Sequence, residues 1–276
     1  MIELNVPYEK AGLPAPEQPA LLEPFCLPAS EEIGKKAHPA VVICPGGGYD
    51  FCSQREAAPV AMRFAGQGVQ AFILWYHCKT PFPNNLIELA AAVAYVREHA
   101  AEYEVDPARI SVCGFSAGAH LAGSLAVYWN REPVTGAFSD AALCRPNAQI
   151  LCYPVISAGE FAHRGSIVNL VGEQDGIDYH NPRADAVSLE KQVSADTPPC
   201  FCWHTSDDNC VPVQNSLLYL SALAGLNIPF EAHYYPHGAH GLSLCDETTA
   251  NGEWHLNAVC AQWFADCTAW IRRGFC

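Results

Sequence analysis

Short apolar segments alternate with longer amphipathic segments along most of the chain. Residues 40–44 (AVVIC) are β-branched like a buried strand, whereas residues 84–103 repeat apolar side chains at helical spacing behind Asn84 or Asn85. This alternation predicts an α/β fold, with a mostly parallel central sheet and helices on both faces. The predicted strands are 40–44, 69–76, 109–113, 149–153, 200–204 and 230–235, and the predicted helices are 56–65, 84–103, 117–129, 213–224 and 253–271.

The length of 276 residues suits one α/β domain spanning residues 1–276. Residues 1–39 are predicted to form an N-terminal extension with early strands. Residues 154–199 are rich in polar residues, Gly and Asp and show no clear strand, which predicts a cap-like excursion over one end of the sheet. Because ligands bind beyond the carboxyl ends of parallel strands, the loops after Cys44, Cys113, His204 and Tyr235 are where the chemistry is expected.

Composition excludes several classes of function. The chain has 29 acidic and 15 basic residues, a formal net charge of −14, so it should repel nucleic acid and anionic membrane surfaces. We find neither a basic start followed by an apolar run nor a membrane-length apolar stretch, and we expect a cytoplasmic protein. The 14 cysteines are scattered, with no CxxC pair, and are interpreted as reduced thiols.

The segment from Gly114 to Gly118 reads G-F-S-A-G, between a predicted strand and a predicted helix. A serine on such a sharp turn sits in a strained backbone conformation at the tip of the sheet, and it needs small neighbours. The N-terminus of the following helix adds partial positive charge and free N–H groups. G-x-S-x-G also occurs by chance in tight turns, but its place after a strand and before a helix favours Ser116 as a nucleophile.

Three consecutive glycines, Gly46 to Gly48, follow the strand at 40–44, after Pro45. Without side chains, their N–H groups can approach a ligand closely, as a developing oxyanion requires. A flexible turn or a phosphate loop are the alternatives. Against the phosphate loop, no Lys-Ser or Lys-Thr follows, and the spacing is not GxGxxG.

Together these motifs resemble the α/β-hydrolase superfamily, and more closely its acetyl esterase/lipase (hormone-sensitive-lipase-like) branch, from about residue 41 to residue 270. The resemblance implies that the N–H groups of Gly47, Gly48 and Ala117 form the oxyanion hole. Tyr49, next to the glycines, is expected to overlook the substrate pocket. Pro45 departs from the pattern, because the family usually has a histidine there.

The resemblance also implies the acid and the base. Residues 205–212 (TSDDNCVP) resemble the family's D-x-x-V-P element, and counting back from Val211 selects Asp208, with Asp207 as the alternative. His240, followed by Gly241 and an apolar residue, fits the family's base. The order Ser116, Asp208, His240 is that of the α/β-hydrolase fold.

A metal site at His237-x-x-His240, with His233 nearby, is the less favoured interpretation, because no carboxylate or cysteine cluster completes it. We expect no metal and no cofactor. Arg55 and Glu56, beyond the glycines, are interpreted as a salt bridge or as charges at a helix start.

The predicted function is hydrolysis of small-molecule carboxylic esters through an acyl-enzyme on Ser116, with short-chain acyl or acetylated-sugar esters as substrates. Two alternatives remain: a small serine peptidase of the prolyl-oligopeptidase type, and a hydrolase fold that serves only as a binding module. Against the peptidase, 276 residues leave no room for its usual gating domain.

Overall fold

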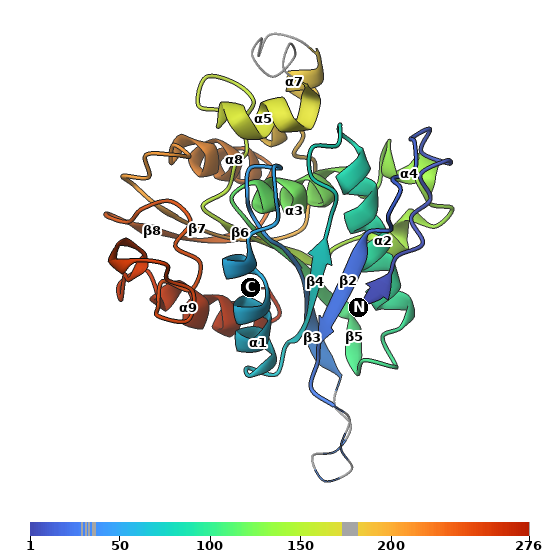
Figure 1. The fold of residues 1–276 in the computed structure, drawn as a ribbon, viewed down its shortest axis with the longest axis horizontal. Helices are drawn as coiled ribbons and strands as arrows, with labels where there is room; N and C mark the ends of the chain where they lie inside the picture. Colours follow the sequence, from blue (N-terminus) through green and yellow to red (C-terminus); the bar gives the residue numbers. More distant parts are fainter. Residues whose placement is uncertain (29, 31, 33, 35–36, 173–181, 276) are drawn as a thin grey trace.

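A central eight-stranded sheet organises the molecule (Figure 1). The computed structural model describes the chain except for residues 29, 31, 33, 35–36, 173–181 and 276. The strand order is β1-β2-β4-β3-β5-β6-β7-β8; β2 pairs antiparallel with β1 and β4, and the other pairs are parallel. The strands are β1 (Ile2–Glu3), β2 (Leu21–Phe25), β3 (His38–Cys44), β4 (Gln70–Trp75), β5 (Val105–Phe115), β6 (Ala148–Cys152), β7 (Cys200–Thr205) and β8 (Phe230–Tyr235).

Helices cover both faces of this sheet, as the alternation predicts. The larger apolar core lies between one face and helices α2 (Asn84–Glu98), α3 (Ala117–Tyr128) and α8 (Gln214–Gly225). The second core lies between the other face and helices α1 (Ala58–Ala65) and α9 (Gln262–Arg272). Since β4, β6, β7, most of β3 and the second half of β5 are buried on both sides, they read as mostly apolar runs rather than as alternating patterns.

Several boundaries differ from the prediction. The helix predicted at 253–271 is wrong as a single element, because a short turn η4 (Glu253–His255) is separated from α9 by residues without helical structure. The helix predicted at 56–65 begins instead with the 3-10 turn η1 (Gln54–Glu56), and Pro59 lies in the first turn of α1. Proline is accommodated there because that position needs no backbone N–H.

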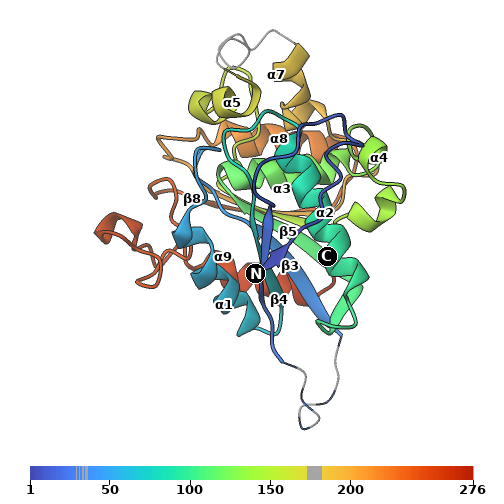
Figure 2. The ribbon, with the colours of Figure 1, turned by 45° about the vertical axis from the view of Figure 1, so that its right-hand side comes forward.

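The helices that the structure describes in segment 154–199 lie at one end of the molecule. These are α5 (Arg164–Val171), α7 (Pro182–Ala186) and the turn η3 (Leu189–Lys191), while residues 173–181 of the predicted excursion lie outside the described residues. Figures 1 and 2 both show α5 and α7 beyond the same end of the sheet. Two further short helices, α4 (Val134–Ala137) and η2 (Ala141–Cys144), connect α3 to β6.

No helix in the described part of the chain is both long enough and apolar enough to span a membrane.

Candidate active site

Ser116 lies on a strained turn between β5 and α3. Its backbone φ of 54° and ψ of −117° are unusual for a residue with a side chain. The flanking glycines are required by space: a Cβ on Gly114 would lie 2.1 Å from the Gly118 carbonyl oxygen, and one on Gly118 would lie 2.1 Å from that of Cys44. The start of α3 therefore packs directly against the end of β3, and the turn holds the serine hydroxyl at the carboxyl edge of the sheet.

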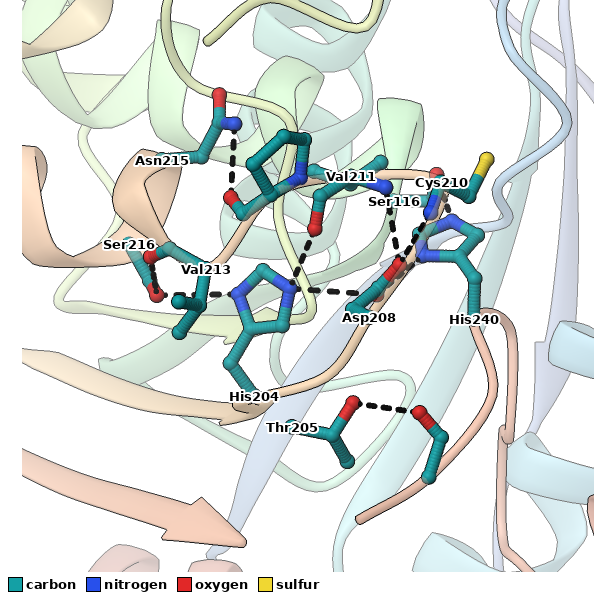
Figure 3. A network of polar contacts seen from close by, with 12 residues as sticks. Ser116, His204, Thr205, Asp208, Cys210, Val211, Val213, Asn215, Ser216 and His240 are labelled. Carbon is teal, nitrogen blue, oxygen red and sulfur yellow. Dashed lines mark hydrogen bonds and ion pairs between the residues drawn. The ribbon is translucent and has the colours of Figure 1, made fainter. Parts of the chain in front are cut away.

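The histidine loop, residues 236–243 after β8, brings His240 to this serine. Its Nε2 lies 2.8 Å from Ser116 Oγ, and its Nδ1 lies 2.7 Å from Asp208 Oδ2 (Figure 3). These distances are those of hydrogen bonds. With the proton on Nδ1, donated to the carboxylate, Nε2 presents a lone pair to the serine hydroxyl, which is the arrangement of a general base.

Asp208 lies in the loop after β7, and four donors from three parts of the chain hold its carboxylate. Its Oδ1 accepts the backbone N–H groups of Cys210 and Val211, both at 2.9 Å, while its Oδ2 accepts from His240 and lies 3.3 Å from His204 Nε2. Burial by itself would raise the pKa of the Asp208 carboxyl, but the hydrogen bonds from His204 and His240 outweigh it and hold that pKa well below its usual range. Asp208 is therefore an anion at neutral pH.

Asp207, the alternative acid, points elsewhere. Its carboxylate accepts from Gly238 N at 2.8 Å and lies 2.9 Å from His237 Nδ1, at the exposed rim of the histidine loop. The two adjacent aspartates thus bind different histidines: Asp207 binds His237, and Asp208 binds His240. The two histidines of the possible metal motif therefore do not share a carboxylate. Among the described residues, no group of three His, Cys, Asp or Glu side chains could hold a metal ion.

The glycine loop, residues 45–49, faces Ser116 across the site. Gly46 N–H donates to Glu56 Oε2 at 2.8 Å, whereas within the described chain no protein acceptor bonds the N–H groups of Gly47, Gly48 or Ala117. Gly47 has a φ of 126°, and a Cβ there would lie 2.1 Å from the Phe51 carbonyl oxygen. Three donors without a described protein acceptor therefore lie beside the nucleophile, and at Gly47 a side chain would not fit.

A cavity of about 390 Å³ opens over these groups. It is lined by Ser116, His240, Gly47 and Gly48, and by His163 and Asn169 from the excursion. This volume is near the lower end of the range for small-molecule sites. The excursion thus forms one wall of the cavity, and Asn169 Nδ2 also donates to the Gly48 carbonyl at 2.9 Å.

Comparison with known proteins identifies the family of the chain. Residues 27–223 match the family model BD-FAE. The chain belongs to the BD-FAE family of α/β-hydrolase esterases.

This BD-FAE domain is similar in sequence to two known enzymes. It is 36% identical over 220 residues to endo-1,4-beta-xylanase B of Butyrivibrio fibrisolvens (77% of this chain, 34% of that protein). It is 30% identical over 213 residues to an acetylxylan esterase of Xylanibacter ruminicola (74% of this chain, 41% of that protein). The chain thus spans less than half the length of these two relatives.

Among solved structures, the acetyl ester-xyloside bifunctional hydrolase of Caldicellulosiruptor lactoaceticus is 38% identical, with a TM-score of 0.74 and coverage of 94% of this chain and 90% of that one. The carboxylesterase Cest-2923 of Lactobacillus plantarum is 25% identical, with a TM-score of 0.81 and coverage of 95% of both chains. These similarities confirm the predicted α/β-hydrolase fold over nearly the whole BD-FAE chain.

The prediction that Tyr49 overlooks the pocket is wrong for this BD-FAE domain. Tyr49 is only 1% exposed, and its hydroxyl lies 2.8 Å from Nδ1 of the buried His120. Its positive φ of 59° lets the chain turn the side chain inward, toward α3 and the ring of Tyr76. Tyr49 therefore anchors the glycine loop to the buried core, through His120 of α3.

Of the two interpretations of Arg55 and Glu56, a salt bridge between them is not found among the described residues, whereas both charges do lie in η1, just before α1. Glu56 is buried, and its carboxylate accepts from Gly46 N and from the Tyr153 hydroxyl. Arg55 Nε donates to the Thr249 carbonyl at 2.5 Å instead.

Two buried residues at the site have no sequence motif of their own. His204 bonds Asp208, the Val211 carbonyl and Ser216 Oγ from the end of β7, and Tyr153 lies against the His240 ring with centroids 5.1 Å apart. The available signal was their position directly at or after the carboxyl end of a predicted strand.

Proposed function

We propose that this chain is a serine hydrolase of small carboxylic esters, with Ser116 as nucleophile, His240 as general base and Asp208 as the residue that orients the base. The observation that carries the proposal is the continuous line of hydrogen-bond distances from Asp208 through His240 to Ser116. Membership of an esterase family and the esterase names of the relatives support the same activity.

The mechanism follows from the positions of these groups. His240 Nε2 takes the proton of Ser116 Oγ as the oxygen attacks the ester carbonyl, and Asp208 stabilises the imidazolium that forms. The unpaired N–H groups of Gly47, Gly48 and Ala117 are the proposed donors to the oxyanion. His240 then protonates the leaving alcohol, and the same base activates the water that hydrolyses the acyl-enzyme.

We propose short acyl esters of small alcohols, including acetylated sugars, as the substrate class. Two similar proteins, an acetylxylan esterase and an acetyl ester-xyloside bifunctional hydrolase, support this class, and a cavity of about 390 Å³ fits a small ester. Further domains of the longer relatives do not enter the proposal, because the chain matches only part of their length.

The test is turnover of 4-nitrophenyl acetate and release of acetate from an acetylated xylo-oligosaccharide. An aminoacyl 4-nitroanilide, measured in parallel, distinguishes the peptidase alternative. A fluorophosphonate probe distinguishes the binding module, because it labels only an activated serine. An active protein that cleaves the anilide in preference to both esters would overturn the proposal, and so would a folded protein that cleaves neither ester and stays unlabelled.

A further inference from the structure

Glu56 is a buried carboxylate that the triad does not use. The residue is only 3% exposed at the end of η1, and no cation lies within ion-pair distance of it among the residues that the structure describes. Burial raises the pKa of the Glu56 carboxyl, and hydrogen bonds from Tyr153 and Gly46, followed by the electrostatic influence of His240 and Arg55, oppose that rise. A carboxylate is costly to bury without a direct ion-pair partner, so its contacts should have a specific role.

One carboxylate oxygen holds the glycine loop. Oε2 accepts the Gly46 N–H at 2.8 Å, and this peptide leads directly into Gly47 and Gly48. A Cβ on Gly46 would lie 2.6 Å from Glu56 Oε2 and 2.6 Å from the Phe115 carbonyl oxygen, so the loop is pressed against both the carboxylate and the strand that carries Ser116. The position of this N–H fixes the two peptides that follow it.

The other oxygen reaches the histidine loop through Tyr153. Oε1 accepts the Tyr153 hydroxyl proton at 2.7 Å, and that hydroxyl oxygen accepts the Ser243 N–H at 3.0 Å. The Tyr153 ring lies edge-on to the imidazole of His240 at 5.1 Å and 72°. Both Tyr153 (φ 38°) and Ser243 (φ 55°) have strained backbones, which persist only where contacts of this kind hold them.

We propose that Glu56 is a positioning residue that ties the glycine loop to the histidine loop, so that the oxyanion donors and the base keep a fixed relation to Ser116. The inference rests on the function proposed above. Glu56 acts through Gly46 on one side and through Tyr153 and Ser243 on the other, and it does not take part in proton transfer.

A link of this kind has an effect that a purely structural role would lack. Glu56 reaches the oxyanion donors and the base only through Gly46, Tyr153 and Ser243, so its loss should act on kcat, through the positions of those groups, more than on KM.

The chain contains a matched control for this arrangement. Glu88 is also buried, and it likewise accepts from a tyrosine hydroxyl (Tyr8, 2.7 Å) and from a backbone N–H (His77, 2.9 Å), but it does not line the active-site cavity. Glu88 also lies 2.8 Å from His77 Nδ1, a contact that Glu56 lacks, so Tyr8→Phe is the closer match and Glu88→Gln the stricter test of stability.

The experiment compares Glu56→Gln and Tyr153→Phe with these controls, using 4-nitrophenyl acetate kinetics, with kcat and KM determined separately, and thermal unfolding. We expect Glu56→Gln to lower kcat about 10- to 100-fold with little change in KM, a smaller loss than removal of an oxyanion donor itself. Tyr153→Phe should also lower kcat. The controls should lose stability to a similar extent but keep the wild-type kcat.

The outcomes separate this inference from the proposed function. Inactive wild-type protein with an unlabelled serine overturns the function itself. Active wild-type protein, with kcat unchanged in Glu56→Gln, overturns the positioning role and leaves the function standing. If Glu56→Gln does not fold, Tyr153→Phe decides: the wild-type kcat in that variant, or an equal loss in Tyr8→Phe, would refute the link.

Discussion

The hydrogen bond between Asp208 and His240 decides which imidazole nitrogen carries the proton. In Asp208→Asn the amide oxygen must occupy the Oδ1 position, because only an acceptor satisfies the N–H groups of Cys210 and Val211, both at 2.9 Å. The amide NH₂ then takes the place of Oδ2 and donates to His240 Nδ1. The ring proton moves to Nε2, which faces Ser116 Oγ and can no longer accept the hydroxyl proton.

We therefore expect Asp208→Asn to fold and to lose about 10⁴-fold in kcat, which corresponds to about 5 kcal/mol of transition-state stabilisation. The assay is steady-state hydrolysis of 4-nitrophenyl acetate, with thermal unfolding to verify the fold. The matched control is Asp207→Asn, where the amide oxygen can still accept the Gly238 N–H and the His237 contact is exposed. This control should stay within about twofold of wild type.

The refuting result is equally specific. If Asp208→Asn stays within about tenfold of wild type in kcat, the tautomer argument fails. If Asp207→Asn shows the large loss instead, the acid has been assigned to the wrong member of the pair.

Three further predictions concern single sites. Ser116→Ala should abolish ester turnover and fluorophosphonate labelling while keeping the unfolding temperature near that of wild type; substantial residual turnover would exclude Ser116 as the nucleophile. Gly47→Ala should lower kcat strongly, about 10²-fold or more, because its Cβ would lie 2.1 Å from the Phe51 carbonyl oxygen, whereas Gly12→Ala, with a positive φ but open space, should cost only about 1 kcal/mol of stability and no activity. Burial lowers the pKa of His120 from 6.5 to about 4, so the unfolded chain binds a proton that the folded chain does not, and stability should fall between pH 6.5 and 4 by up to about 3 kcal/mol. Urea unfolding should show a shallower slope with pH in His120→Gln, and an unchanged slope would contradict the assignment.

The sheet and the position of Ser116 could be predicted from the sequence because both depend on local patterns. Strands buried on both faces show as short apolar runs, and the turn at Ser116 needs Gly114 and Gly118 within two residues on either side. Asp208 and His240 could be assigned only through the resemblance, since their meeting depends on two loops far apart in the sequence. Their assignment as catalytic residues remains a prediction, which the 2.7 Å and 2.8 Å distances support.

The site predictions that differ from the structure concern side chains whose direction is set by tertiary contacts. Tyr49 follows the glycines as a pocket residue would, but a left-handed backbone turns it toward His120 in the core. The charges of Arg55 and Glu56 are adjacent in sequence, yet each binds a distant backbone group, at Thr249 and at Gly46 respectively. Nothing in the local pattern reveals which partners lie across the fold.

The way residue 45 is held bears on the departure of Pro45 from the family pattern. The Pro45 carbonyl oxygen accepts the buried Tyr76 hydroxyl at 2.6 Å, and a Cβ on Gly118 would lie 2.5 Å from the same oxygen. Both the hydrogen bond from the Tyr76 side chain and the close packing of Gly118 act on the carbonyl group of residue 45 rather than on its side chain. A ring that cannot donate from its own nitrogen can therefore occupy the position while the neighbouring peptides stay in place.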